Sequence, residues 1–119
     1  MARVLVIEDE GIVRVMLRTM LQTAGHEVFE ARDGEEGLQV YRQNLPDLVV
    51  TDLLMSGLGG IEMIEEMRKD CPDIKIIVLT GHLRTIASEI ERLNVGHVFE
   101  KPIHMPDLLD VMTDLLGDR

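Results

Sequence analysis

The stretch that most constrains the fold is an unbroken aliphatic run, Leu48 to Thr51, followed by a single carboxylate, Asp52. Pro46 and Asp47 precede this run, and glycines follow it at 57, 59 and 60. A β-branched, aliphatic run bounded by turn residues is typical of a strand buried on both faces. Such strands form parallel sheets, whose ligands bind outside the carboxyl ends. Asp52 is the first charge at that end and is therefore a candidate functional residue.

Four further apolar runs, over residues 3–7, 26–30, 74–80 and 97–100, alternate with helical periodicities. The periodicities cover 11–24, 33–45, 61–70 and 83–93, and a last helix has Pro106 in its first turn. Five alternations of strand and helix predict an α/β fold with a five-stranded parallel sheet between two layers of helices. The apolar positions of the first helix are Ile12, Met16, Leu17, Met20 and Leu21. In the other helices we expect the main apolar positions to face inward: Leu38, Tyr41, Leu45, Ile61, Ile64, Met67, Leu83, Ile86, Ala87, Ile90, Leu93, Leu108, Leu109, Met112, Leu115 and Leu116.

Size and charge limit the possible functions. A chain of 119 residues is expected to form one domain, residues 1–119. Its formal net charge of −10 argues against a nucleic acid or an anionic membrane as partner, because clustered Lys and Arg make those contacts. No apolar stretch approaches the ~20 residues of a membrane span, and no signal peptide is evident. The single cysteine, Cys71, is interpreted as a neutral loop residue, and we expect a cytoplasmic protein.

Polar side chains follow the predicted strands at their carboxyl ends: Glu8, Asp9, Asp52, Thr80 and Lys101. Parallel strands bring these ends to one edge, and in the doubly wound, flavodoxin-like order 2-1-3-4-5 the first and third strands are neighbours. Carboxylates at ~4 Å repel by about 4 kcal/mol at an effective dielectric of 20, so the group favours a bound cation. An oxygen-only ligand set without His or Cys suits Mg²⁺.

The remaining polar residues at this edge suit a phosphoryl group. Lys101 can pair with one phosphoryl oxygen, and Thr80 can donate a hydrogen bond to another. Asp52 is then left as the nucleophile, because a carboxylate can accept a phosphoryl group as an acyl phosphate. Each acid alone could simply cap a helix or fill a loop. Their combination with Thr80 and Lys101 favours the chemical interpretation.

In these residues the chain resembles the receiver domains of two-component response regulators, the CheY-like family, over essentially its whole length. The matching residues are Glu8, Asp9, Asp52, Met55, Gly60, Thr80, Gly81, Lys101 and Pro102. The resemblance implies that Asp52 is the phosphoacceptor and that Thr80 and Lys101 engage the phosphoryl group. It also implies that Asp9, Asp52 and the backbone carbonyl of Leu54 bind Mg²⁺ directly, with Glu8 acting through water.

The resemblance further implies a sensor histidine kinase or a histidine phosphotransfer protein as phosphodonor, and an output domain or downstream protein as recipient of the signal. By the same analogy, the output surface is expected on the last two helices and the last strand. The domain would catalyse only its own phosphorylation and slow dephosphorylation, and it would not be an enzyme that acts on other substrates.

Several positions depart from the family pattern. Ser56 stands where proline is usual, which predicts a looser loop over 56–60, and Val98 stands where an aromatic switch residue is common. Phe99 is one residue later and should face the opposite side of its strand. The signal would then depend on Thr80 and the following helix. Leu54 offers no hydrogen bond to an attacking water, which predicts slow self-dephosphorylation.

Two other functions compete with this interpretation. A Mg²⁺-dependent phosphatase with an aspartyl nucleophile needs a second acid two residues after Asp52, where this chain has Leu54. A receiver-like domain that binds partners without being phosphorylated is the main alternative. His82 is interpreted as an exposed loop histidine rather than a proton-handling neighbour of the site. His26, His97 and His104 have no spacing that suggests a metal site and are interpreted as structural.

Overall fold

The computed structural model describes residues 2–54 and 59–117. Its strands are β1 (Arg3–Ile7), β2 (Glu27–Ala31), β3 (Leu48–Thr51), β4 (Lys75–Thr80) and β5 (His97–Glu100). Its helices are α1 (Gly11–Thr23), α2 (Gly34–Asn44), α3 (Gly60–Asp70), α4 (Leu83–Leu93) and α5 (Met105–Leu116). All strand pairs are parallel and the order is β2-β1-β3-β4-β5, which confirms the predicted five-stranded sheet.

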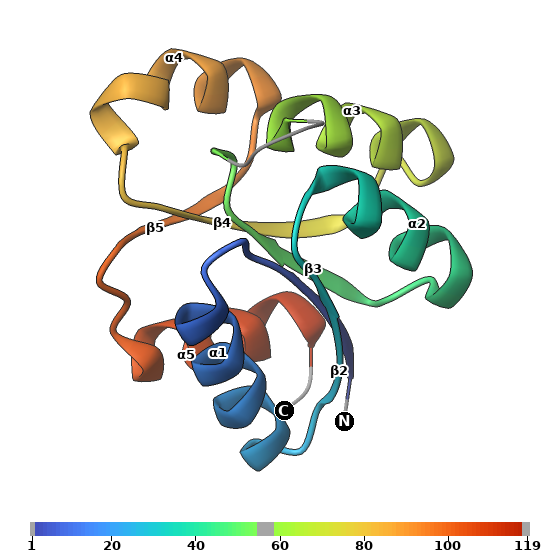
Figure 1. Cartoon of the computed structure of the whole chain (residues 1–119), viewed down its shortest axis with the longest axis vertical. Helices are drawn as coiled ribbons and strands as arrows, with labels where there is room; N and C mark the ends of the chain where they lie inside the picture. The colour runs from blue at the N-terminus through green and yellow to red at the C-terminus, as the bar shows by residue number, and fades with distance from the viewer. Residues whose placement is uncertain (1, 55–58, 118–119) are drawn as a thin grey trace.

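The helices cover both faces of the sheet (Figure 1). Helices α1 and α5 lie together on one face, and α2, α3 and α4 lie on the other. Each face has its own apolar core, since Leu17 and Met112 belong to one cluster while Met63 and Ile90 belong to the other. The three-layer arrangement is therefore the one predicted from the alternation of strands and helices.

The register of the sheet brings the candidate residues to one edge. Ile7 of β1 lies opposite Thr51 of β3, so the next residues, Glu8 and Asp52, leave the sheet side by side. The Asp52 amide fixes this pairing by donating to the Ile7 carbonyl at 3.1 Å. On the other side of β3, the Lys101 amide donates to the Thr80 carbonyl at 2.8 Å.

Val98 and Phe99 point to opposite faces of β5, as predicted. Val98 packs against the core under α2, α3 and α4, whereas Phe99 packs against the core under α1 and α5. The one aromatic side chain of this strand therefore lies on the face away from α4.

Two residues expected to face inward are exposed instead. Helix α2 ends at Asn44, and Leu45 follows in a left-handed conformation with φ 47°, so its side chain leaves the helical period and is 67% exposed. Ala87 is exposed because the buried stripe of α4 is narrow and consists of Ile86, Ile90 and Leu93.

In α1 the buried residues are Leu17 and Leu21, while Ile12, Met16 and Met20 are exposed. The apolar residues of this helix therefore form two stripes along its surface, and one of them packs on the sheet. The predicted strand over 26–30 begins one residue later, at Glu27. The expectation of a looser loop over 56–60 concerns mainly residues 56–58, which lie outside the described residues.

Among the residues that the structure describes, no helix is both long enough and apolar enough to cross a membrane.

Candidate functional site

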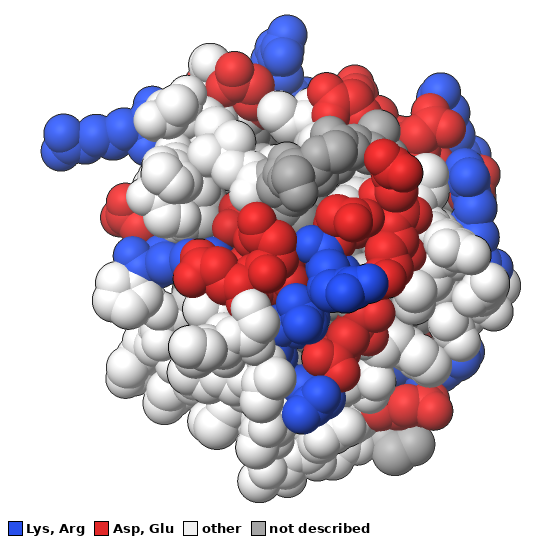
Figure 2. Space-filling model, viewed as in Figure 1, with Lys and Arg blue, Asp and Glu red and all other residues white. Residues whose placement is uncertain are grey.

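Three carboxylates gather where β1 and β3 end. Glu8, Asp9 and Asp52 each place an oxygen within 4.8 Å of the others. Glu8 and Asp52 are 1% and 6% exposed, whereas Asp9 is exposed. Two of the three carboxylates are therefore shielded from water. Repulsion between charges is stronger in this low-dielectric environment than in solvent. Figure 2 shows that acidic side chains cover much of the middle of this face of the molecule, with Lys and Arg side chains between them.

Lys101 holds the two buried carboxylates. Its Nζ donates to Glu8 Oε1 at 2.6 Å and to Asp52 Oδ2 at 2.9 Å, and Glu10 Oε1 lies 3.6 Å away. The other oxygens of the buried pair are also bonded: Glu8 Oε2 accepts from the Glu10 amide and Asp52 Oδ1 from the Leu54 amide. Each buried side-chain nitrogen or oxygen in the described part of the chain has a hydrogen-bond partner.

The titration of Glu8 and Lys101 follows from this arrangement. Burial raises the pKa of Glu8 above its ordinary value, although hydrogen bonds from Lys101 and the Glu10 amide oppose the rise. For Lys101, burial alone would lower the pKa, but the hydrogen bonds to Glu8 and Asp52 outweigh burial and raise it. Lys101 is therefore a permanent cation at neutral pH, and it supplies the positive charge that the carboxylates need.

Thr80 is fully buried and its hydroxyl is engaged within its own loop. Its Oγ1 accepts a hydrogen bond of 3.0 Å from the His82 amide, at the beginning of α4. Thr51 is buried next to Asp52, and its hydroxyl donates to the Asp52 carbonyl at 2.7 Å. The hydroxyl of Thr80 thus links the site to α4, while that of Thr51 fixes the main chain at the end of β3.

The structure brings together the residues that the sequence places at the strand ends, and it adds contacts that the sequence does not reveal. The hydrogen bond between Lys101 and Glu8 joins residues 93 positions apart. Arg14 also contacts the site, since its Nη1 donates to the Glu8 carbonyl at 2.8 Å. The signal that could have indicated Arg14 is its place one helical turn after Glu10, where a long side chain can reach back over the start of α1.

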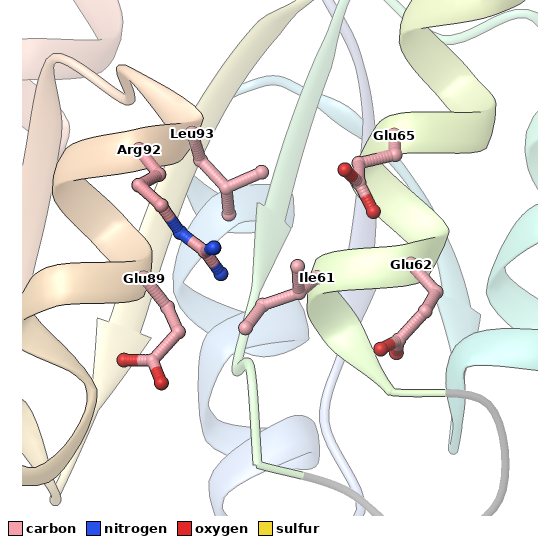
Figure 3. Close-up of a pocket in the computed structure, with 6 residues that line it drawn as sticks. All are labelled: Ile61, Glu62, Glu65, Glu89, Arg92 and Leu93. Carbon is pink, nitrogen blue, oxygen red and sulfur yellow. The ribbon is translucent and has the colours of Figure 1, made fainter.

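A hollow of about 310 Å³ lies away from these residues, between α3 and α4 (Figure 3). Ile61 and Leu93 provide its apolar surface, and Glu65 and Arg92 reach into the space between the helices. None of its lining residues is among the acids, Thr80 and Lys101 that the sequence places at the strand ends. The chemistry of the molecule therefore centres on the strand ends.

Comparison with known proteins identifies the family. Residues 4–113 match the family described as the response regulator receiver domain. The chain belongs to this family. A receiver domain is a module of two-component signalling and not a conventional enzyme, and the family works generally with histidine kinases and output domains.

Curated relatives of this receiver domain include longer regulators. The chain is 40% identical over 94 residues to a probable transcriptional regulator, ycf27, of Guillardia theta, covering 79% of this chain and 36% of the relative. It is 35% identical over 116 residues to the response regulator MprA of a Mycobacterium species, covering 96% of this chain and 50% of the relative. The chain thus spans between about a third and a half of the length of these relatives.

Solved structures agree with this receiver fold. The response regulator TrrA of Thermotoga maritima, in complex with Mg²⁺ and BeF, is 34% identical, with a TM-score of 0.88 over 98% of this chain and 100% of that chain. The chemotaxis protein CheY4 of Vibrio cholerae is 28% identical, with a TM-score of 0.89 over 98% of this chain and 99% of that one. A family member with a similar fold therefore binds Mg²⁺.

Proposed function

We propose that residues 1–119 form one receiver domain that accepts a phosphoryl group on Asp52 from a phosphohistidine of a sensor histidine kinase or a phosphotransfer protein. The observation that carries the proposal is the state of the Asp52 carboxylate. It is nearly buried at a strand end, with one oxygen on Lys101 and the other on the Leu54 amide. A carboxylate held in this way is oriented before the donor arrives, which lowers the entropic part of the barrier.

In the proposed transfer an Asp52 oxygen attacks phosphorus, and the new O–P bond forms as the P–N bond of phosphohistidine breaks. The electron pair of the P–N bond stays on the imidazole nitrogen, and the ring leaves as neutral imidazole when its other nitrogen carries a proton. Lys101 remains charged and can turn from Asp52 to a phosphoryl oxygen. Thr80 would exchange its hydrogen bond with the His82 amide for one to the phosphoryl group, and so report the new charge to α4.

Mg²⁺ fits the ligand atoms of this site. Three carboxylates within 4.8 Å, without His or Cys, form the hard oxygen set that Mg²⁺ prefers. We propose that Asp9, Asp52 and the Leu54 carbonyl bind the ion directly and that Glu8 acts through water. The ion supplies positive charge to the phosphoryl oxygens. Glu8 and Lys101, which are hydrogen-bonded to each other, would keep the carboxylates in position to hold the ion.

The docking surface for the donor is proposed next to the site, on α1. Ile12 is 87% exposed, and Val15, Met16 and Met20 are between 36% and 43% exposed. Figure 2 shows a largely uncharged surface below the acidic centre, where Figure 1 places α1. A hollow of about 510 Å³ begins at Lys101 and is bordered by Met16. A donor protein that brings its phosphoryl group to Asp52 must cover part of the surface around this hollow. The exposed apolar side chains of α1 would stabilise its docking there.

The remaining parts of the proposal concern the setting of the domain. The output surface on α4, β5 and α5 and the downstream partner are proposed by family analogy. A cytoplasmic location is proposed because one unpaired cysteine suits a reducing compartment.

The test is phosphorylation by a small donor such as acetyl phosphate, followed by intact-mass measurement. We expect one added phosphoryl group that requires Mg²⁺ and does not appear in Asp52→Asn. If Mg²⁺ binds but no phosphoryl group is added to the wild type, the proposal is wrong, and the chain is a receiver-like domain that binds partners without being phosphorylated.

A further inference from the structure

A side chain of α1 hydrogen-bonds to the main chain of the acidic turn, residues 8–10, which connects β1 to α1. Arg14 Nη1 donates to the Glu8 carbonyl at 2.8 Å. The backbone amide of Glu8 is also bonded, since it donates to the Ala31 carbonyl of β2 at 3.0 Å. Helix α1 has no side-chain hydrogen bond at its N-cap, Glu10. The Arg14 contact does not replace such a cap, because a guanidinium only donates hydrogen bonds, but it ties the main chain just before α1 to the helix itself.

The guanidinium of Arg14 is itself anchored. Its Nε lies 3.4 Å from Glu30 Oε1, on β2, and its side chain is 18% exposed. Arg18, one turn later on α1, pairs with the other oxygen of Glu30 at 2.9 Å. Glu30 thus joins two arginines, of which Arg14 also bonds the acidic turn, whereas the hydrogen bond of Arg18 goes to Glu30. The fixed fork of a guanidinium can bond a carbonyl and a carboxylate at once, which an ammonium cannot do in the same geometry.

We propose that Arg14 is a positioning residue for the Mg²⁺ site, which fixes the main chain of Glu8 so that the next residue, Asp9, presents its carboxylate to the ion. This inference rests on the proposed function, since it concerns the same metal site. Asp9 is exposed, so packing does not fix its side chain. Its place beside the two buried carboxylates depends instead on the backbone of the turn, which Arg14 ties to β2 through Glu30.

Charge and position have opposite effects here, which makes the proposal testable. A guanidinium beside a divalent cation repels it, so a role through charge alone means that removal of Arg14 tightens Mg²⁺ binding. A positioning role means that removal weakens binding, because Asp9 loses its fixed geometry. Groups that orient metal ligands typically change metal affinity by about 10- to 100-fold when they are removed.

The experiment is calorimetric titration of Mg²⁺ into the unphosphorylated chain. We expect both Arg14→Gln and Arg14→Lys to bind Mg²⁺ about 10-fold more weakly than the wild type. The matched control is Arg18→Gln, which removes the same charge and a contact with the same carboxylate but leaves the Glu8 carbonyl bonded, and it should bind within about twofold of the wild type. Far-UV circular dichroism verifies that each variant is folded. If Arg14→Gln does not fold, Arg14→Lys serves as the test.

Phosphorylation by acetyl phosphate gives a second measurement. The Mg²⁺ concentration for half-maximal rate should rise by about the same factor in the Arg14 variants, while the rate at saturating Mg²⁺ stays near that of the wild type. Unchanged or tighter Mg²⁺ binding in the folded Arg14 variants would overturn the inference, and so would equal weakening in Arg18→Gln. Absence of Mg²⁺ binding or of phosphorylation in the wild type would instead refute the proposed function.

Discussion

Replacement of Lys101 by methionine tests the electrostatic structure of the site. Methionine is similar in length but has no charge, so Glu8 and Asp52 would keep their places and lose the ammonium that bonds both. The resulting effect on the free energy of unfolding can be derived from the separation of the carboxylates. Oxygens within 4.8 Å repel by about 3 kcal/mol or more at an effective dielectric of 20.

This value agrees with the cost of breaking other buried ion pairs, about 3–5 kcal/mol. Since the site lies at the open edge of the sheet, we expect Lys101→Met to lose about 3 kcal/mol of stability near pH 7 without Mg²⁺. Mg²⁺ should restore part of the loss by supplying the missing positive charge, and it should stabilise the variant by about 2.7 kcal/mol at 100 times its dissociation constant.

The same variant should gain stability as the pH falls. Burial already raises the pKa of Glu8 in the folded state above its ordinary value of 4.5, and loss of the Lys101 hydrogen bond raises it further. A carboxyl whose folded-state pKa is raised binds its proton more tightly in the folded state, so stability is greatest below the unfolded pKa and falls as the pH rises through the folded one. Lowering the pH from about 7 to about 5 should therefore recover part of the loss.

The assay is urea unfolding followed by far-UV circular dichroism in EDTA, at both pH values, with and without excess Mg²⁺. Lys69→Met is the matched control, because the Lys69 side chain is 71% exposed and pairs with a surface acid, Glu66, so its loss should change the midpoint little. If Lys101→Met is as stable as the wild type near pH 7 in EDTA, the carboxylates do not depend on Lys101 and the reasoning is refuted.

Three single substitutions test other parts of the molecule. The exposed Leu54 side chain beside Asp52 offers no hydrogen bond to water, so Leu54→Asn should lose its phosphoryl group about tenfold faster, measured by decay of the phosphorylated mass; equal or slower decay contradicts this. A Cβ on Gly60 would lie 2.5 Å from the Leu53 Cα, so Gly60→Ala should cost on the order of 1–3 kcal/mol in urea unfolding, whereas Gly96→Ala, with nothing within 4 Å, should not. Ile12→Asp should slow phosphorylation by a phosphohistidine protein about tenfold or more but leave the rate with acetyl phosphate unchanged, and equal slowing with both donors would show that α1 is not the docking surface.

The sheet could be predicted from the sequence because its central strands are buried on both faces. The aliphatic runs that form β1 and β3 are bounded by charges or turn residues, and their limits are close to those observed. The edge strand β2 has a weaker signal, since Glu27 and Glu30 interrupt its apolar residues, and its predicted limits are one residue early.

The errors in the helices arise where a period of 3.6 residues does not decide burial. Leu45 continues the apolar spacing of α2, but the backbone turns left-handed there and ends the helix before Pro46. In α1 the spacing alone cannot tell which stripe packs on the sheet. Leu17 and Leu21 are buried, while the equally apolar Ile12, in the first turn of the helix, is exposed.

For the site, the topology was predictable and the side-chain contacts were not. The order of the strands follows from the pattern of a doubly wound fold, and it places Glu8 and Asp52 side by side. The hydrogen bonds from Lys101 to both acids and from Arg14 to the Glu8 carbonyl depend on side-chain conformations, which no spacing in the sequence specifies.

Chemical identification of the phosphorylated residue would establish whether Asp52 is the phosphoacceptor. After incubation with Mg²⁺ and acetyl phosphate, borohydride reduces an acyl phosphate to the alcohol, which converts a phosphorylated aspartate into homoserine that peptide mass spectrometry can locate. We predict homoserine at position 52 alone, and only when Mg²⁺ is present. Reduction at Asp9 or another carboxylate, or a stable phosphoryl group that borohydride does not remove, would contradict it.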